Sequence, residues 1–219
     1  MKIELVFLGP PACGKGTQTS KLSTYLKFPH VDTGSLLRQS IADKTADGLI
    51  AKGYIDKGQL VPLDIVASII KNRLKEADCH HGFILDGFPR SIEQAQILED
   101  IKPEINEGVE VVFKVIYFDI DHDSLIHRIM YRRSCSKCGK IYNLETLKPK
   151  NEGVCDICGC GLIQRKDDTE EIAEMRFQTY LEQTAPLIKF YGDQGVLHRI
   201  DANGSVDEVW ERILKVTSN

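Results

Sequence analysis

The sequence predicts an α/β fold in which helices flank an open, parallel, five-stranded sheet and two mobile subdomains are inserted. Short apolar runs, rich in branched and aromatic residues, alternate with helical patterns, and a glycine-rich loop follows the first run. Nearly continuous apolar runs are typical of strands buried on both faces of a parallel sheet. We expect four strands from such runs, and a fifth from a weaker signal at 30–31. The four are at 3–8, 83–85, 111–118 and 196–200.

Helical patterns occupy the segments between these strands. The first runs from Thr17 to Leu26 and is stopped by Pro29, because proline cannot donate the backbone hydrogen bond that a helix interior needs. We expect further helices at 63–77, 91–101, 123–133, 169–191 and 206–216. Strands alternating with helices predict that ligands bind at the carboxyl ends of the strands.

Two segments interrupt the alternation, and we interpret both as insertions on one core. The first, residues 32–61, is polar and helical, and the second, residues 131–168, holds clustered cysteines. The core is then formed by residues 1–31, 62–130 and 169–219. A chain of 219 residues is long enough for one buried core with such insertions.

Composition excludes several classes of protein. The net charge of −4 argues against a broad basic surface for nucleic acid. No apolar run approaches the roughly 18–20 residues that span a membrane, and the N-terminal residues do not resemble a signal peptide. The seven cysteines are an odd number and five lie within 26 positions, which argues against a disulfide framework. We therefore expect a protein of the reducing cytoplasm.

The glycine-rich loop has the pattern of a phosphate-binding P-loop. It reads Gly9-Pro-Pro-Ala-Cys-Gly-Lys-Gly-Thr17, directly after the first apolar run. In such a loop successive backbone N–H groups face one anion and the next helix adds its positive dipole end. Lys15 would contact the β- and γ-phosphates, and the Thr17 hydroxyl would bind Mg²⁺. A chance glycine/proline turn is the alternative, but strand, loop, lysine and helix follow in the required order.

The clustered cysteines have the spacing of a structural zinc site. Cys135 and Cys138 form one C-x2-C unit, and Cys155 and Cys158 form a second after 16 residues. Four thiolates close the tetrahedral shell of Zn²⁺ and leave no open position. Cys160 is an alternative fourth ligand, and a redox role for the C-x2-C pairs is a second alternative.

Charged residues follow the strand at 83–85. Asp86, at the carboxyl end of that strand, is placed to hold Mg²⁺ through its waters. Arg90 follows a proline and can bind a phosphate with both arms of its guanidinium. Several other arginines lie near candidate loops of this acidic chain, which suggests a clamp on more than one phosphate. They are Arg38, Arg128, Arg132, Arg133, Arg165 and Arg176.

Taken together, these motifs resemble the adenylate kinase family over essentially the whole chain. The matching strings are Gly9-x-x-x-x-Gly-Lys-Gly-Thr-Gln18, Thr33-Gly34-x-x-x-Arg38, Asp56-x-Gly58-x-Leu60-Val61, Leu85-Asp-Gly-Phe-Pro-Arg90 with Gln94, and Arg165-x-Asp167-Asp168 followed by Arg176. The four-cysteine insertion is similar to the long metal-binding lid of many bacterial members. The resemblance implies reversible transfer of a phosphoryl group, Mg·ATP + AMP ⇌ 2 ADP, by a monomer that binds neither nucleic acid nor membrane.

The resemblance also implies roles for particular residues. Those on the ATP side are Ala12, Cys13, Gly14, Lys15, Gly16, Thr17, Arg128, Arg132, Ile141, Tyr142 and Gly204. Those on the AMP side are Thr33, Arg38, Gln59, Leu60, Val61, Gly87, Phe88, Pro89, Arg90, Gln94, Arg165 and Arg176. Catalysis is assigned to Lys15, Arg90, Arg132, Arg165 and Arg176. Such chemistry needs positioning and charge neutralisation more than an acid or a base.

Three positions depart from the family pattern. Ala12 stands where the family commonly has glycine, so the loop must hold it in a conformation open to L-residues. Cys13 is either a small filler of the loop or a thiol activated by Lys15 and the helix N-terminus. Ser35 stands at a position that is usually acidic.

Two other functions are alternatives for this sequence. One is a related nucleoside-monophosphate kinase, acting on UMP or CMP or using GTP, although the long cysteine-containing lid disfavours the UMP/CMP type. The other is a zinc-ribbon NTPase that binds nucleic acid, which the net charge and the AMP-side strings disfavour.

Overall fold

The computed structural model, which describes residues 1–55, 61–164 and 168–217, has the predicted parallel five-stranded sheet. The strand order is β2-β3-β1-β4-β8, and every pairing in this sheet is parallel. The strands are β1 (Lys2–Leu8), β2 (His30–Asp32), β3 (Gly82–Asp86), β4 (Val111–Asp119) and β8 (Leu197–Asp201). The weak signal at 30–31 is thus confirmed as an edge strand.

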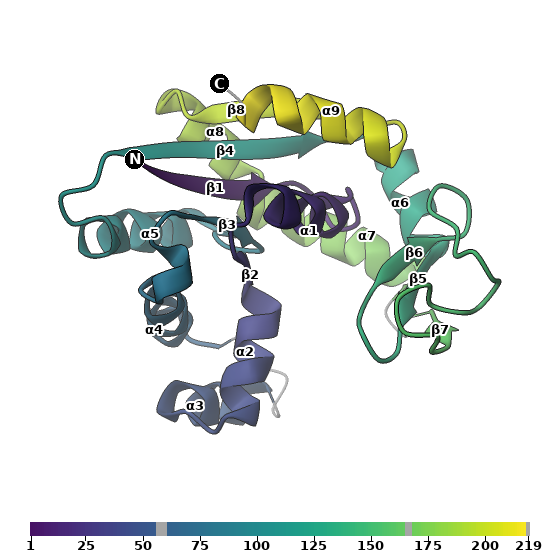
Figure 1. The fold of residues 1–219 in the computed structure, drawn as a ribbon, viewed down its shortest axis with the longest axis horizontal. Coiled ribbons are helices and arrows are strands. Elements are labelled where there is room, and N and C mark those ends of the chain that lie inside the picture. The colour runs from purple at the N-terminus through teal and green to yellow at the C-terminus, as the bar shows by residue number, and fades with distance from the viewer. Residues whose placement is uncertain (56–60, 165–167, 218–219) are drawn as a thin grey trace.

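The sheet is buried on both faces, as its continuous apolar runs predict. Leu5 and Phe7 of β1 pack with α1 (Lys15–Leu26) and α9 (Val206–Thr217) on one face. Val6 and Leu8 point to the other face, because successive strand residues alternate sides. Helices α4 (Leu63–Leu74), α5 (Ile92–Ile105) and α8 (Pro186–Asp193) cover that second face (Figure 1). A short 3₁₀ turn, η1 (Ala77–Cys79), joins α4 to β3.

Several predicted helices were wrong in extent. Helix α4 ends at Leu74, before the predicted residue 77, and α5 continues to Ile105, beyond the predicted residue 101. Two further differences have a clear structural cause. Helix α6 (His122–Met130) ends three residues before the predicted Arg133, because β5 (Arg132–Cys135) pairs with strands on both sides. The single helix predicted over 169–191 is divided into α7 (Glu170–Thr179), the π-helical turn η2 (Tyr180–Thr184) and α8. Pro186, at the start of α8, lacks an N–H, and the preceding Ala185 N–H donates to Tyr180 O, five residues back, at 2.9 Å.

The two insertions project from the sheet as separate lobes (Figure 1). One consists of α2 (Thr33–Ala42) and α3 (Ala46–Ile55), which follow β2. The other contains a three-stranded antiparallel sheet in the order β6-β5-β7, with β6 at Ile141–Asn143 and β7 at Leu162–Ile163. Within the ranges that the structure describes, no helix is both long and apolar enough to cross a bilayer.

Gly48 allows α2 and α3 to pack closely. A Cβ atom at this position would lie 2.0 Å from the Ser40 carbonyl oxygen, so backbone would have to move. We expect Gly48→Ala to lower the free energy of unfolding by about 1–3 kcal/mol through overpacking. Gly53→Ala is the matched control on the same helix, since nothing lies within 4 Å of its added Cβ. There we expect a gain of up to about 1 kcal/mol from helix propensity. Urea denaturation of both variants checks this, and equal stabilities would contradict it.

Strand β1 also carries a buried ion pair. Lys2 Nζ lies 3.5 Å from Glu4 Oε1, and the two side chains are 3% and 0% exposed. Lys2 also donates to Ile105 O and to Asn106 Oδ1. The Glu4 carboxylate oxygens accept no hydrogen bond from the described residues, so Lys2 is their principal compensation.

This pair gives a second stability prediction. We expect Lys2→Met alone to cost about 3–5 kcal/mol of unfolding free energy, because it leaves a buried charge unpaired. Adding Glu4→Leu should restore or exceed the original stability, since paired apolar replacements of buried ions are often neutral or stabilising. Chemical denaturation of the single and double variants measures both. A double variant less stable than Lys2→Met would refute the argument.

Candidate active site

The glycine-rich loop connects the end of β1 to the start of α1, as the sequence predicts. Helix α1 begins at Lys15, two residues earlier than expected, and Gly14 caps it with φ of 101°. Gly9 has φ of 147°, and a Cβ there would lie 2.9 Å from both Cys13 Sγ and Phe118 Cβ. Ala12 has φ of 61°, inside the small left-handed region that L-residues adopt at a cost.

Cys13 and Lys15 contact each other in this loop, where Lys15 Nζ donates to Cys13 Sγ at 3.5 Å, but they differ in exposure. Cys13 is 1% exposed and packs in the apolar cluster beneath α1, which supports its interpretation as a small filler. Lys15 is half-buried, and its Nζ donates to Gly9 O at 2.6 Å and Pro10 O at 3.0 Å. The ammonium group therefore lies within the loop whose N–H groups would face a phosphate.

Asp86 lies at the carboxyl end of β3, beside the loop. His30 Nε2 lies 3.2 Å from Asp86 Oδ2, and Thr19 Oγ1 donates to the same oxygen at 3.3 Å. Burial opposes ionisation of Asp86, but the His30 hydrogen bond and the charge of Lys15 outweigh it and lower the pKa of the carboxyl group. An ionised carboxylate at this place is suited to a hydrated Mg²⁺ ion.

His30 and Thr19 are partners that sequence reasoning missed. His30 of β2 is level with Ile84 of β3, two residues before Asp86, so the side chains of His30 and Asp86 lie on the same face of the sheet. The sequence held one usable signal, a histidine within the weakly predicted fifth strand, but strand order could not be read from it.

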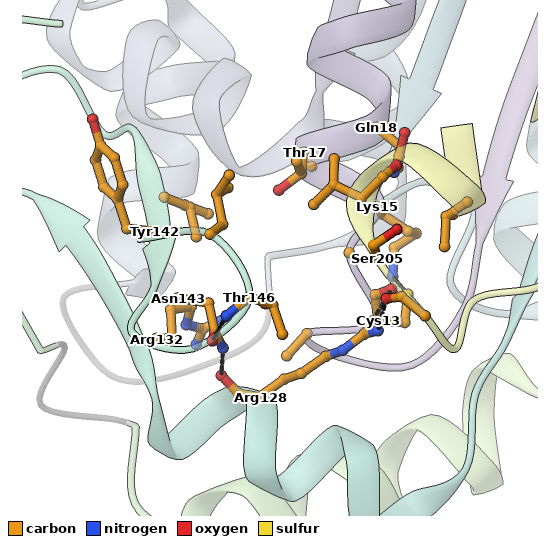
Figure 2. Close-up of a pocket in the computed structure, with 18 of the residues that line it drawn as sticks. Cys13, Lys15, Thr17, Gln18, Arg128, Arg132, Tyr142, Asn143, Thr146 and Ser205 are labelled. Atoms are coloured by element: carbon orange, nitrogen blue, oxygen red, sulfur yellow. Dashed lines mark hydrogen bonds between the residues drawn. The ribbon is translucent and has the colours of Figure 1, made fainter. Parts of the chain in front are cut away.

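A cavity of about 350 Å³ opens between the loop and the cysteine-containing insertion. Figure 2 shows Lys15 and Thr17 of α1 on one side, with Arg128 of α6 and Arg132 of β5 on another. Its predicted lining residues are Ala12, Cys13, Gly14, Lys15, Gly16, Thr17, Asp86, Arg90, Arg128, Arg132, Ile141, Tyr142 and Gly204. Those that the sequence did not predict include Gln18, Asn143, Thr146, Leu147, Ser205, Val206 and Val209.

Two of the three arginines that line this cavity, Arg128 and Arg132, are hydrogen-bonded to other parts of the chain. Arg128 donates to Cys13 O at 3.1 Å and to Ala202 O at 2.9 Å, so it joins α6 to the P-loop. Arg132 forms a two-pronged ion pair with Asp168, whose side chain is fully buried. Asp168 thus orients Arg132 toward the cavity, a partnership that no short-range sequence pattern signals.

One group of the residues assigned to the AMP side lies between the end of β3 and the first turn of α5. Arg90 is exposed, and its Nε donates to Gly87 O at 2.8 Å. Gln94 accepts from Arg90 N at 2.7 Å, while Phe88 is buried in the core. Pro89 follows it through a cis peptide bond.

The remaining AMP-side residues are distributed between the core and the insertion. Thr33 is buried at the start of α2 and Arg38 is exposed one turn further on. Val61 packs against the core, and Arg176 is half-buried on α7. Gln59, Leu60 and Arg165 lie outside the described residues.

The cysteine cluster has the arrangement that its spacing predicts. The sulfur atoms of Cys135, Cys138, Cys155 and Cys158 all lie within 4.8 Å of one another. The N–H of Gly139 donates to Cys135 O, and that of Gly159 donates to Cys155 O. Both glycines have φ near 70°, so the two turns share one geometry. This donor set fits a tetrahedral Zn²⁺ ion.

Cys160 and Tyr142 have structural places around this cluster. The Cys160 carbonyl accepts from Cys155 N at 2.9 Å, and its sulfur is not among the four that converge. Tyr142 is 2% exposed, and its hydroxyl donates to Cys155 Sγ, which lowers the pKa of that thiol to about 6. Figure 2 shows the Tyr142 ring turned away from Lys15. Tyr142 therefore borders the cavity while its hydroxyl belongs to the cysteine cluster.

The structure combines a P-loop after β1, a carboxylate at the end of β3 and an arginine-lined cavity beside an inserted lobe. Together these features define a phosphotransferase of the nucleoside-monophosphate kinase class. The family model described as adenylate kinase matches residues 7–196. This chain therefore belongs to the adenylate kinase family.

Curated relatives match over nearly their whole length. An adenylate kinase of Thermosipho africanus is 42% identical over 98% of this chain and 99% of its own. One of Archaeoglobus fulgidus is 42% identical over 96% of each chain. One of Clostridium tetani is 41% identical over 98% of each chain.

Proposed function

We propose that this protein catalyses Mg·ATP + AMP ⇌ 2 ADP and so maintains the balance of adenine nucleotides. The observation that carries the proposal is the single cavity that joins the P-loop, Asp86 and three arginines: Arg90, Arg128 and Arg132. The relatives are named adenylate kinases, and they align along nearly the whole chain. We further propose that the enzyme acts as a cytoplasmic monomer.

The ATP phosphates would bind in the P-loop, residues 12–17. Backbone N–H groups of the loop and the N-terminus of α1 would face the phosphates, with Lys15 neutralising their charge. The adenine would be bordered by Arg128, Ile141, Tyr142 and Gly204. Arg128 Nη2 donates a hydrogen bond to Gly204 O. Mg²⁺ would be held by Thr17 directly and by Asp86 through water, and would neutralise charge on the transferred group.

AMP would bind on the opposite side, between the α2–α3 lobe and the start of α5. Arg38 and Arg90 would hold its phosphate, and Arg132, Arg165 and Arg176 would neutralise the transferring group. Thr33, Gln59, Leu60, Val61 and Gln94 would recognise the base, and the Gly87–Pro89 turn would support it.

The two inserted lobes, residues 32–61 and 131–168, would close over the nucleotides. Closure excludes water, which would otherwise accept the phosphoryl group and waste ATP. We propose that Zn²⁺ on Cys135, Cys138, Cys155 and Cys158 braces the second lobe, whose polar composition cannot form an apolar core. Among the described residues of this lobe, the apolar cluster has three buried members, Cys135, Tyr142 and Cys155, with Cys158, Cys160 and Leu162 packed against them.

A coupled assay for ADP tests the reaction with purified protein. AMP, UMP, CMP and GMP are offered as acceptors, with ATP or GTP as the donor. We expect AMP and ATP to be strongly preferred. Preference for another monophosphate, or no monophosphate-dependent use of ATP, would reject the proposal. Salt-dependent binding of RNA or DNA without such activity would instead favour a nucleic-acid-binding NTPase.

A further inference from the structure

The start of α2 explains why serine at position 35 is tolerated where an acidic residue is usual. Asp32 is the N-cap of the helix, and its Oδ2 accepts a hydrogen bond from Ser35 N at 2.7 Å. Arg38, one turn along, donates through Nη2 to Ser35 Oγ at 2.9 Å. The same Nη2 lies 3.7 Å from Asp32 Oδ2. A carboxylate, a hydroxyl and a guanidinium are thus linked on one helix face.

Gly34 shows where the guanidinium lies. A Cβ at position 34 would lie 3.2 Å from Arg38 Nη1 and 3.5 Å from Asp32 Oδ2. The guanidinium therefore turns back over the backbone of the first turn and does not extend freely. Its side chain is nevertheless 73% exposed, so nitrogen atoms not engaged by Asp32 and Ser35 remain open to an anion.

The position of this turn connects it with the active site. Strand β2 ends at Asp32, which is level with Asp86 in the sheet, and α2 begins at the next residue (Figure 1). Arg38 is consequently anchored near the carboxyl edge of the sheet, where ligands of open α/β sheets bind.

We propose that Asp32 and Ser35 are an exchangeable pair that positions Arg38 for the phosphate of AMP; this rests on the proposed AMP site. Serine and aspartate cap helices about equally well, and aspartate three residues before arginine pairs with it on a helix. The observed pair and the exchanged pair (Asp32→Ser with Ser35→Asp) each supply one N-cap side chain and one carboxylate beside Arg38. Asp32 and Ser35 are positioning residues here and act only through Arg38.

Positioning of Arg38 for a phosphate requires a single carboxylate beside its guanidinium. Without a carboxylate, the long arginine side chain recovers its rotamer freedom, which phosphate binding must then remove. With two carboxylates, the phosphate meets a second negative charge at the site that should attract it. Each single substitution is therefore harmful, and the exchange of both is not.

Four variants test this: Asp32→Ser, Ser35→Asp, the double exchange and Arg38→Met. Calorimetric titration gives the Kd of AMP and of ATP for each, and steady-state kinetics gives KM and kcat. We expect each single exchange to raise the Kd of AMP about fivefold or more, and the double variant to return within about twofold of the original, as coupled neighbours do. The Kd of ATP and the melting temperature should stay unchanged. If Asp32 and Ser35 only stabilised the fold, the single exchanges would instead lower the melting temperature.

The outcomes separate this inference from the proposal on which it rests. If Arg38→Met leaves the Kd of AMP unchanged, the AMP-site assignment falls and the inference falls with it. If Arg38→Met weakens AMP binding but the single exchanges do not, only the positioning role is overturned. A double variant that binds AMP no better than the weaker single variant also overturns it.

Discussion

Replacing Lys15 with methionine is expected to lower kcat about 10²–10³-fold, the usual effect of removing one charge-stabilising donor from an active site. Methionine retains much of the apolar stem but has no ammonium group to neutralise phosphate charge. Lys15 Nζ lies 2.6 Å from Gly9 O and 3.0 Å from Pro10 O, so it is already at the loop. Initial rates of ADP formation, with both substrates saturating, measure the effect.

Lys21→Met is the matched control for this experiment. Lys21 is on the same helix, but it pairs with exposed Asp207 on α9, and pairs of that kind contribute little. We expect its kcat to equal that of the unchanged protein. Near-normal turnover by Lys15→Met would overturn the role assigned to Lys15, and an equal loss in Lys21→Met would point to damage of helix α1.

Replacing Cys155 with serine is expected to abolish stoichiometric zinc binding and to loosen the cysteine-containing insertion while the core stays folded. Zinc sites of this type contribute roughly 10–16 kcal/mol of apparent binding free energy in peptides. Burial of apolar side chains contributes little to this lobe, because its described apolar cluster is small. Metal analysis and amide hydrogen exchange measure the result. Exchange should accelerate in β5, β6 and β7 and remain slow in β1 and β4.

Cys160→Ser is the control, because the Cys160 sulfur is outside the converging four. It should retain one zinc ion per chain and normal protection of the insertion. Loss of zinc from Cys160→Ser would reassign the fourth ligand. Cooperative unfolding of the whole chain on chelation, or no change anywhere, would refute the proposed local role of the metal.

Local features were predictable because they depend on neighbours in the chain. Four of the five strands of the parallel sheet followed from continuous apolar runs, and the P-loop followed from glycines and a lysine at fixed spacing. The convergence of Cys135, Cys138, Cys155 and Cys158 followed from two C-x2-C turns. The extent of the long helix was misjudged at Pro186, although proline is itself a local signal. The turn before it keeps a helical backbone by shifting to i→i+5 hydrogen bonding.

Partners that are distant in sequence could not be found in this way. The pairing of Arg132 with buried Asp168 spans 36 residues, and that of His30 with Asp86 spans 56. Both depend on which elements the fold brings together. The choice between Cys158 and Cys160 likewise depended on where each sulfur points, which spacing alone left open.

By itself, then, the sequence determined the class of sheet, the phosphate loop, the cysteine site and, through its motifs, the family. These are encoded in periodicity and short spacing, which local backbone geometry turns directly into structure. Only the tertiary structure decided how the charged groups are paired. The pairs of Asp168 with Arg132 and of His30 with Asp86 form because the fold brings distant segments of the chain together. The physical reason is that a charge's partner is selected by distance and burial in three dimensions, neither of which is a property of position along the chain.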